Sequence, residues 1–194
     1  MKRTVLFSLL LALVTFAVFW NIQYNQFVKY DDDFYVYENP QVQAGLTIDN
    51  LKWAFTTTHH AIWHPVTWLS HMTDCQLFGV KHPPRGHHLS SVVIHALNAV
   101  LLFILLRRMS RAFWKPALVA AFFALHPMHV ESVAWIADRR DILSTFFLHL
   151  CILFYVEYAR SLNVRWYTLT LLALALGTAA ILAGFGPNLQ AVNC

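Results

Sequence analysis

The chain alternates between long apolar runs and short polar segments, a pattern that predicts several membrane-spanning helices. An uninterrupted apolar run over residues 4–20 follows Lys2 and Arg3 and is just long enough to cross a hydrocarbon core. The run ends without the small residues of a signal-peptidase site, so we expect an uncleaved first transmembrane helix over residues 1–20. Further apolar blocks occupy residues 89–106, 117–125, 142–159 and 166–185.

The block over residues 117–125 is the shortest, and it crosses a membrane only if neighbouring residues contribute. The basic residues favour this crossing, because five crossings place every Lys/Arg-rich segment on one side. These segments contain Lys2 and Arg3, then Arg107, Arg108, Arg111 and Lys115, then Arg160 and Arg165. The positive-inside rule makes that side cytoplasmic, so we expect a cytoplasmic N-terminus and a long loop outside the cytoplasm.

The predicted fold class is therefore an all-α, polytopic transmembrane protein with about five spans. The domains expected are the first transmembrane helix (1–20), an extracytoplasmic loop with interfacial helices (21–86), transmembrane helices two to five (87–185) and a short tail (186–194). In the loop, Thr47 is suited to cap one helix, and Pro65 to open a second that Gly79 ends. Both predicted helices are short, amphipathic and rich in aromatic residues, which is typical of helices that lie in a membrane interface.

Composition agrees with a membrane protein. Of the 194 residues, 58% are hydrophobic and 12% are charged, against about 25% charged residues in soluble domains. The net charge of +4 does not indicate nucleic-acid binding, because the basic residues separate apolar runs instead of forming a stripe on a water-exposed face. The three cysteines are too few for a disulfide framework and form no CxxC pair.

Three adjacent acids, Asp31, Asp32 and Asp33, follow the first span closely and should lie near the membrane on its outer side. Neighbouring carboxylates raise one another's pKa, which suits a general base or a cation site. A solvated acidic loop is the alternative. The aromatic residues around these acids favour partial burial.

The histidines fall into three groups, which suggests metal binding as one interpretation because histidine is the commonest metal ligand. The groups are His59, His60 and His64; His82, His87 and His88; and His126 and His129 with Glu131. They are similar to the boxes of membrane di-iron desaturases and hydroxylases, but they lack the full spacing and lie on the opposite side of the predicted topology. We favour hydrogen bonds to a donor phosphate or to the backbone, and we assign no metal site.

The charged and polar residues near and within the predicted spans have two interpretations. Arg139 and Arg140, flanked by Asp138 and Asp141, either form local ion pairs or hold a phosphate bidentately. Intramembrane polar groups are candidates for function, but interhelical hydrogen bonds also explain them, and we favour that explanation. These intramembrane residues are His95, Asn98 and His149.

Taken in order, the motifs of the chain resemble those of bacterial membrane proteins with C-terminal tetratricopeptide repeats, a group similar to the eukaryotic transmembrane-and-tetratricopeptide O-mannosyltransferases. The motifs that carry this resemblance are Tyr30-Asp31-Asp32-Asp33, Asn39-Pro40, Gly45-Leu46-Thr47, Trp53-Ala54-Phe55, Trp63-His64-Pro65, Asp74-Cys75-Gln76-Leu77-Phe78-Gly79, Gly86-His87-His88 and Ala124-Leu125-His126-Pro127 through Trp135. The resemblance covers residues 1–176.

The resemblance implies a glycosyltransferase of GT-C type. Such an enzyme transfers a sugar, here mannose, from a polyprenyl-phosphate donor to Ser/Thr hydroxyls of a protein acceptor outside the cytoplasm, in a bacterial inner membrane. The family's acidic pair corresponds to Asp31 and Asp32, one of which would accept the proton of the attacking hydroxyl. We add His126, His129, Arg139 and Arg140 as donor-phosphate ligands, an assignment that rests on topology and charge. Beyond the bilayer, the donor and the acceptor, the resemblance implies no cofactor, and no nucleic acid is expected as a partner.

The C-terminal part departs from the family pattern. After Leu176 the family continues with a Lys-Pro segment, further spans and the repeats, whereas this chain ends at Cys194. We therefore expect an apparently truncated protein. Two other functions stay open, namely a histidine-rich membrane metalloenzyme and a truncated, non-catalytic membrane subunit.

Overall fold

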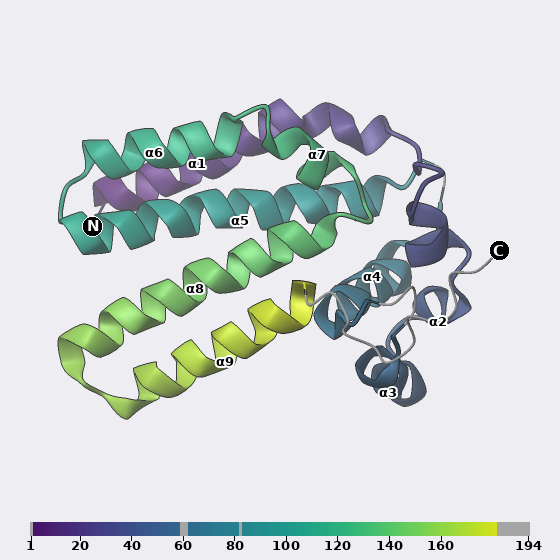
Figure 1. Ribbon diagram of the computed structural model, residues 1–194. Helices are drawn as coiled ribbons and strands as arrows, with labels where there is room; N and C mark the ends of the chain where they lie inside the picture. The colour runs from purple at the N-terminus through teal and green to yellow at the C-terminus, as the bar shows by residue number, and fades with distance from the viewer. Residues whose placement is uncertain (1, 59–61, 82, 182–194) are drawn as a thin grey trace.

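A computed structural model describes residues 2–58, 62–81 and 83–181, and within them all regular structure is helical (Figure 1). This confirms the all-α fold class. The elements are α1 (Lys2–Phe19), η1 (Trp20–Tyr24), η2 (Asp33–Tyr37), α2 (Pro40–Gln43), α3 (Ile48–Thr56), α4 (Pro65–Phe78), α5 (Arg85–Ser110), α6 (Trp114–Leu125), α7 (His129–Ala134), α8 (Arg139–Ser161) and α9 (Val164–Ile181). The predicted tail (186–194), the end of the last predicted span and His59, His60 and His82 lie outside the described residues.

Four segments are long and apolar enough to cross a membrane, which confirms a multi-pass protein. They are α1 with η1, α5, α8 and α9. The apolar helix α6 has 12 residues, which corresponds to about 18 Å of helix, whereas the hydrocarbon core is about 30 Å thick. The predicted crossing over residues 117–125 is therefore not a full-length transmembrane helix.

Helices α5 and α8 run in the same direction, so the chain has to return to the other end of the bundle between them. At their N-terminal ends, Arg139 Nη2 donates to the backbone oxygen of His87 at 2.6 Å. At their C-terminal ends, Arg160 donates to the backbone oxygen of Arg108. The two helices thus run parallel, so the segment between them has to travel back along the bundle.

Helix α6 makes the first part of this return and α7 the second. The C-terminal end of α6 reaches the level of His95, whose Nε2 lies 3.1 Å from the backbone oxygen of Ala124. A turn over residues 126–128 follows, and α7 packs against α5 and α8. The weakest of the predicted spans thus corresponds to the short helix α6, a turn and α7, and its crossing of the membrane stays a prediction.

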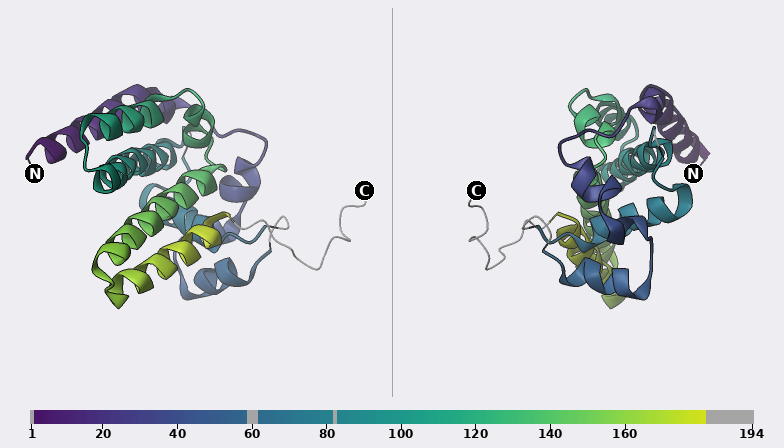
Figure 2. Two further views of the ribbon diagram at one scale, coloured as in Figure 1. Left: turned by 60° about the vertical axis from the view of Figure 1, so that its left-hand side comes forward. Right: turned by 90° about the vertical axis from the view of Figure 1, so that its right-hand side faces the viewer.

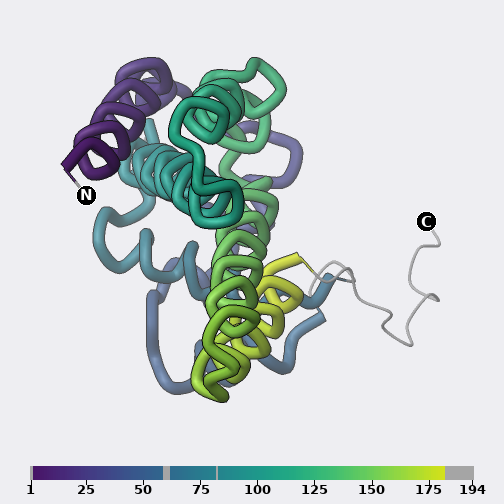
Figure 3. The backbone as a smooth tube through the Cα atoms, turned by 90° about the vertical axis from the view of Figure 1, so that its left-hand side faces the viewer, coloured from purple at the N-terminus to yellow at the C-terminus, as the bar shows by residue number. Residues whose placement is uncertain are grey.

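The bundle has two chemically different ends. Helices α1, α5 and α6 pack together, and α8 and α9 pair beside them (Figure 3). The N-terminus and the α5–α6 and α8–α9 turns lie at one end, while η2, α2, α3 and α4 gather at the other (Figures 1 and 2). The predicted grouping of all Lys/Arg-rich segments at one end is therefore present.

Small residues and interhelical hydrogen bonds hold the bundle together. Buried alanines of α6 pack against α1 and α5 around Leu11 and Phe103, and small side chains of this kind let helices approach closely. Asn98 Nδ2 donates to the backbone oxygen of Ile142 at 2.8 Å, and His95 contacts Ala124 as described above. The interhelical hydrogen bonds predicted for these two intramembrane residues are confirmed. The same prediction for His149 is not, because its buried Nδ1 has no hydrogen-bond partner among the described residues.

The two predicted loop helices form where the capping residues place them. Thr47 Oγ1 accepts the Asn50 N–H at 3.1 Å at the start of α3, while α4 begins at Pro65 and ends before Gly79, whose φ is +68°. The apolar side of α4 does not face a membrane interface as expected, because Trp68 and Met72 are buried in a core with η2 and α2. The apolar side of α3 is exposed, so its interfacial placement stays a prediction.

The close contact between α4 and α5 yields a stability prediction. A Cβ atom at Gly86 would lie 2.2 Å from the Phe78 ring and 2.5 Å from Phe78 Cβ, so Gly86→Ala should force the α4–α5 turn apart. We expect a loss of about 1–3 kcal/mol, the usual cost of overpacking, measured by thermal unfolding in detergent. Gly177→Ala is the matched control, since its Cβ would meet its nearest neighbour at 3.2 Å. Equal melting temperatures for Gly86→Ala and the wild type would contradict the prediction.

Candidate functional site

The acidic triad lies where the chain turns into η2, next to the start of α8. The Tyr35 N–H donates to the backbone oxygen of Asp31 at 3.0 Å. Asn39 closes the far side of η2, because its Nδ2 donates to the Phe34 oxygen and its Oδ1 accepts the Val42 N–H, each at 3.2 Å. This short segment is therefore held in a fixed shape by its own hydrogen bonds.

Asp32 joins this segment to a distant part of the chain. Its Oδ2 accepts the Val28 N–H at 2.8 Å, and its Oδ1 accepts the Ala137 N–H at 2.9 Å. The residue is only 1% exposed. Burial raises the pKa of the Asp32 carboxyl, an effect that the two N–H donors oppose. Both carboxylate oxygens are thus occupied in holding the loop against the residues that precede α8.

Asp31 has a different environment and belongs to a cluster that we call the loop site, formed by Asp31, Tyr35, Asp138 and Arg140. The Asp31 side chain is half-buried, and within the described residues its carboxylate accepts no hydrogen bond. Burial raises the pKa of Tyr35, Asp31 and Asp138 add to the rise, and the guanidinium of Arg140, which hydrogen-bonds the Tyr35 hydroxyl, opposes it. Tyr35 is thus within electrostatic reach of the other three groups.

Arg140 is the half-buried cation of the loop site. Its Nε lies 3.6 Å from Asp138 Oδ1 and 4.0 Å from Asp141 Oδ1, so these ion pairs are loose. Burial is also the main reason that the pKa of Asp138 is raised. The arrangement can accept a proton at a carboxylate and can offer a guanidinium to an anion within the same small region.

Tyr35 packs against two aromatic side chains of the loop, His64 and Trp68, which also stack on each other. Its ring is stacked on His64 with centroids 5.3 Å apart, and on Trp68 with centroids 5.1 Å apart. A third ring, that of His71, lies 6.4 Å away in an edge-on orientation. These contacts hold the Tyr35 hydroxyl on the side of Arg140.

Arg139 points the opposite way from Arg140 and is completely buried. It forms an ion pair with Asp74, and its Nη2 donates to the His87 oxygen at 2.6 Å. Its remaining contacts are to the hydroxyls of Ser70 and Ser91, each at 3.3 Å. Every nitrogen of this guanidinium is thus engaged with α4 or α5, a placement that favours a positioning role over phosphate binding.

The predicted ligands His126 and His129 lie in the α6–α7 turn and at the start of α7. His126 is exposed in the turn between α6 and α7, where its Nδ1 accepts the Met128 N–H at 3.2 Å. His129 packs on Phe123 with centroids 4.4 Å apart, and burial lowers its pKa, as does His126. In the described part of the chain, neither histidine forms a hydrogen bond or ion pair with Asp31, Asp32, Arg139 or Arg140.

The histidine groups do not converge in the described structure. His87 and His88 are buried at the start of α5, His64 lies in the loop core, and His126 lies in the α6–α7 turn. Across residues 2–58, 62–81 and 83–181, no group of three or more His, Cys, Asp or Glu side chains is arranged to hold a metal ion.

Fold and site together define a class: an all-helical, multi-pass membrane protein with a carboxylate–guanidinium site beside one end of its bundle. No family model matches the chain, and no solved structure matches it. Its homologues are protein O-mannosyl-transferases of the Tmtc group, to which it is similar over most of its length.

Two of these homologues come from Drosophila melanogaster. Protein O-mannosyl-transferase Tmtc2 is 30% identical over 165 residues, which are 81% of this chain and 17% of the relative. Protein O-mannosyl-transferase Tmtc1 is 30% identical over 178 residues, 87% of this chain and 20% of the relative. Human Protein O-mannosyl-transferase TMTC4 is 29% identical over 79% of this chain and 24% of the relative. The chain thus spans about a fifth of the length of the curated relatives that it matches.

Two features of the site are not evident from the motifs taken one by one. The first is Tyr35, and the second is the Asp74 carboxylate that pairs with Arg139. Asp74 follows Ser70 by four residues on α4, so both lie on one side of the helix and meet the same guanidinium. The available signal was the spacing of four residues between Ser70 and Asp74 on the predicted helix.

The buried histidine beside Arg139 predicts a pH dependence. Burial, with Arg139 nearby, holds the pKa of His71 well below its usual 6.5, so the folded protein binds fewer protons than the unfolded chain below about pH 6.5. Stability is therefore lost as the pH falls, by up to about 1.4 kcal/mol per pH unit for one such group. We expect the fall in melting temperature between pH 7.5 and 5.5 to be smaller in His71→Phe than in the wild type.

The matched control for this experiment is His126→Phe, which removes an exposed histidine. It should leave the pH dependence of the melting temperature unchanged. An identical pH dependence in the wild type and in His71→Phe would show that His71 protonates as readily in the folded protein as in the unfolded chain.

Proposed function

We propose that the chain forms the catalytic-loop part of a GT-C-type glycosyltransferase that transfers mannose from a polyprenyl phosphate to Ser/Thr hydroxyls of a protein. The observation that carries this proposal is the loop site at the end of a membrane bundle. There Asp31, whose carboxylate accepts no hydrogen bond from the described residues, and Arg140 both interact electrostatically with Tyr35. The printed activity of the homologues, protein O-mannosyl transfer, agrees with it.

Asp31 is the better candidate for the general base. Its side chain is half-buried, and it accepts no hydrogen bond from the described residues. Asp32, by contrast, has both oxygens bound to backbone N–H groups. In the proposed step, Asp31 accepts the hydroxyl proton while the hydroxyl oxygen attacks the anomeric carbon. The bond from that carbon to the phosphate oxygen breaks, and the lipid phosphate leaves with the electron pair and with inversion at the carbon. Asp32 then acts as a positioning residue.

Arg140 is suited to stabilise the leaving phosphate. Its ion pairs with Asp138 and Asp141 are loose, and a guanidinium can hold two phosphate oxygens at once. Arg139 contributes indirectly, because its burial fixes the start of α8. His126 and His129 remain proposed ligands of the donor.

A groove along α6 supports the role of His126 in donor binding. The groove, of about 390 Å³, is lined by apolar side chains including Leu118, Phe122 and Leu125, and it ends at His126 and Pro127. An isoprenoid chain is apolar and carries its phosphate at one end. The groove therefore offers a complementary surface for the isoprenoid chain, with the imidazole of His126 at one end of it.

We further propose that the protein lies in a bacterial inner membrane with its N-terminus in the cytoplasm and the loop site outside. The support is the gathering of basic residues at the end opposite η2, as the positive-inside rule requires. Lipid-linked sugar and acceptor would then meet on the outer side.

The assignment of the base predicts a large loss of activity in Asp31→Asn. A general base contributes about 10²–10⁴-fold to a reaction rate, so mannose transfer from polyprenyl-phosphate mannose to an acceptor peptide should fall by that factor in reconstituted vesicles. Donor binding should change little, because the side chain keeps its size. Asp33→Asn is the matched control and should stay near wild-type activity. Unchanged turnover in Asp31→Asn would remove Asp31 from the mechanism.

The proposed orientation is testable by labelling introduced cysteines from outside the cell. Cys75 is unsuitable, because it is buried and burial raises the pKa of its thiol to about 11. In a Cys194→Ser background, Asp49→Cys on α3 should react with a membrane-impermeant maleimide, whereas Asn163→Cys in the α8–α9 turn should not. Both positions are exposed. The reverse labelling pattern would overturn the orientation and with it the placement of the loop site.

A further inference from the structure

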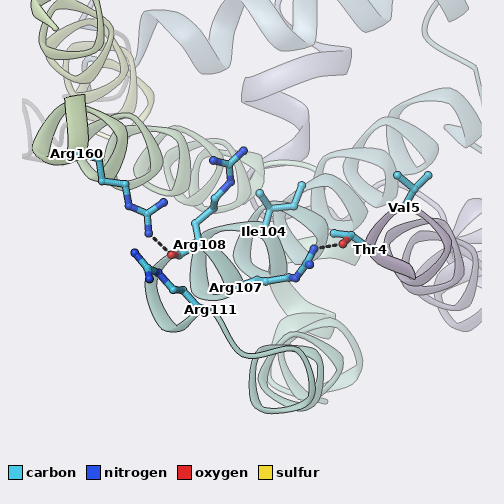
Figure 4. Close-up of a pocket in the computed structure, with 7 residues that line it drawn as sticks. All are labelled: Thr4, Val5, Ile104, Arg107, Arg108, Arg111 and Arg160. Carbon is cyan, nitrogen blue, oxygen red and sulfur yellow. Dashed lines mark hydrogen bonds between the residues drawn. The ribbon is translucent and has the colours of Figure 1, made fainter. Parts of the chain in front are cut away.

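A cleft opens at the end of the bundle opposite the loop site. It has a volume of about 620 Å³ and is lined by residues of α1, α5 and α8 and of the turn after α5. The lining residues are Thr4, Val5, Ile104, Arg107, Arg108, Arg111 and Arg160 (Figure 4). Four of the seven are arginines, and none of them takes part in the proposed transfer.

The positive charge of this cleft is only partly compensated. Glu157 pairs with Arg108 at 2.9 Å and with Arg160 at 3.9 Å, and no other carboxylate of the described residues reaches these arginines. Arg107 donates to the Thr4 hydroxyl, and Arg160 to the backbone oxygen of Arg108, as Figure 4 shows. Both acceptors are neutral. The arginines thus surround a space with an excess of positive charge.

Arg111 contributes a further guanidinium to the cleft. Within the described residues it forms no side-chain hydrogen bond and no ion pair, although it lies at the cleft. Its backbone has a φ of +56° as the C-terminal cap of α5, a conformation that most residues adopt rarely. This turn of the backbone places Arg111 next to the ends of α5 and α8.

The floor and the surroundings of the cleft are apolar. Val5 and Ile104 line it, and the adjoining side of α1 exposes apolar side chains including Leu6 and Leu9. Because α1, α5 and α8 are all long enough to span a bilayer, their ends lie at the depth of the lipid headgroups. An occupant of the cleft therefore meets cations at its polar end and an apolar helix surface below.

We propose that this cleft binds the phosphate of an anionic membrane phospholipid, whose acyl chains run along α1 and α5. Basic pockets between transmembrane helices commonly hold acidic headgroups, and arginine suits a phosphate because of its planar, bidentate geometry. A free phosphate ion has the charge of the lipid headgroup but lacks the acyl chains, so binding of the lipid and binding of the free ion can be distinguished. The inference does not depend on the transferase activity.

The test measures binding of short-chain phosphatidylglycerol to the purified chain in a neutral detergent, with short-chain phosphatidylcholine and inorganic phosphate as comparison ligands. Phosphatidylglycerol should bind more tightly than either, and added salt should weaken it. Arg111→Gln should weaken binding about fivefold, and Arg108→Gln combined with Arg111→Gln should weaken it further by a similar factor. Arg111→Gln breaks no intramolecular bond in the described structure, so the fold is expected to persist.

Lys115→Gln combined with Arg165→Gln is the matched control. It removes two exposed basic residues from the same end of the bundle, and neither lines the cleft. An equal loss of binding in this control would show general attraction to the basic end and would overturn the site. Equal affinity for phosphatidylcholine would also overturn it, and so would displacement of the lipid by an equimolar amount of inorganic phosphate, since the cleft would then bind the anion alone.

Discussion

The buried ion pair between Arg139 and Asp74 is the interaction on which the arrangement of the outer end depends. It ties the first residue of α8 to α4, and the same guanidinium holds the His87 oxygen and the Ser91 hydroxyl of α5. Three helices from distant parts of the chain therefore meet at one fully buried side chain. Loss of one partner of such a pair costs about 3–5 kcal/mol, because the other charge stays buried and unpaired.

The position of Arg139 also determines what its neighbours can do. Since consecutive residues at the start of a helix point in different directions, an inward Arg139 leaves Arg140 directed toward the loop. Two residues earlier, the N–H of Ala137 is available to Asp32. The loop site is thus assembled from the acidic turn and the start of α8, and one structural arginine sets the geometry of both the anchored aspartate and the free one.

Much of this fold was predictable because local chemistry determines it. Thr47, Pro65 and Gly79 fix the limits of α3 and α4 through capping, a fixed φ and a positive φ, which depend on few neighbours. The different environments of Arg139 and Arg140 were not predictable, nor was the difference in hydrogen bonding between Asp31 and Asp32. Both depend on partners far along the chain. The burial of Trp68 and Met72 on α4 in a protein core was missed for the same reason. An amphipathic period predicts that one side of a helix is covered, but it does not say whether protein or membrane covers it.

The basic residues from which the membrane topology was predicted also distinguish the two ends of the bundle. The same helices connect the basic end to the end that carries the loop site. Helix α5 accepts the bonds of Arg139 at one end and carries Arg107 and Arg108 at the other, where Arg111 follows as its C-terminal cap. A phosphate held between α1, α5 and α8 would neutralise repulsion among the arginines that these helices bring together. Such neutralisation favours close packing of the helix ends, and because α5 and α8 run parallel, it supports the alignment that Arg139 completes at the loop site.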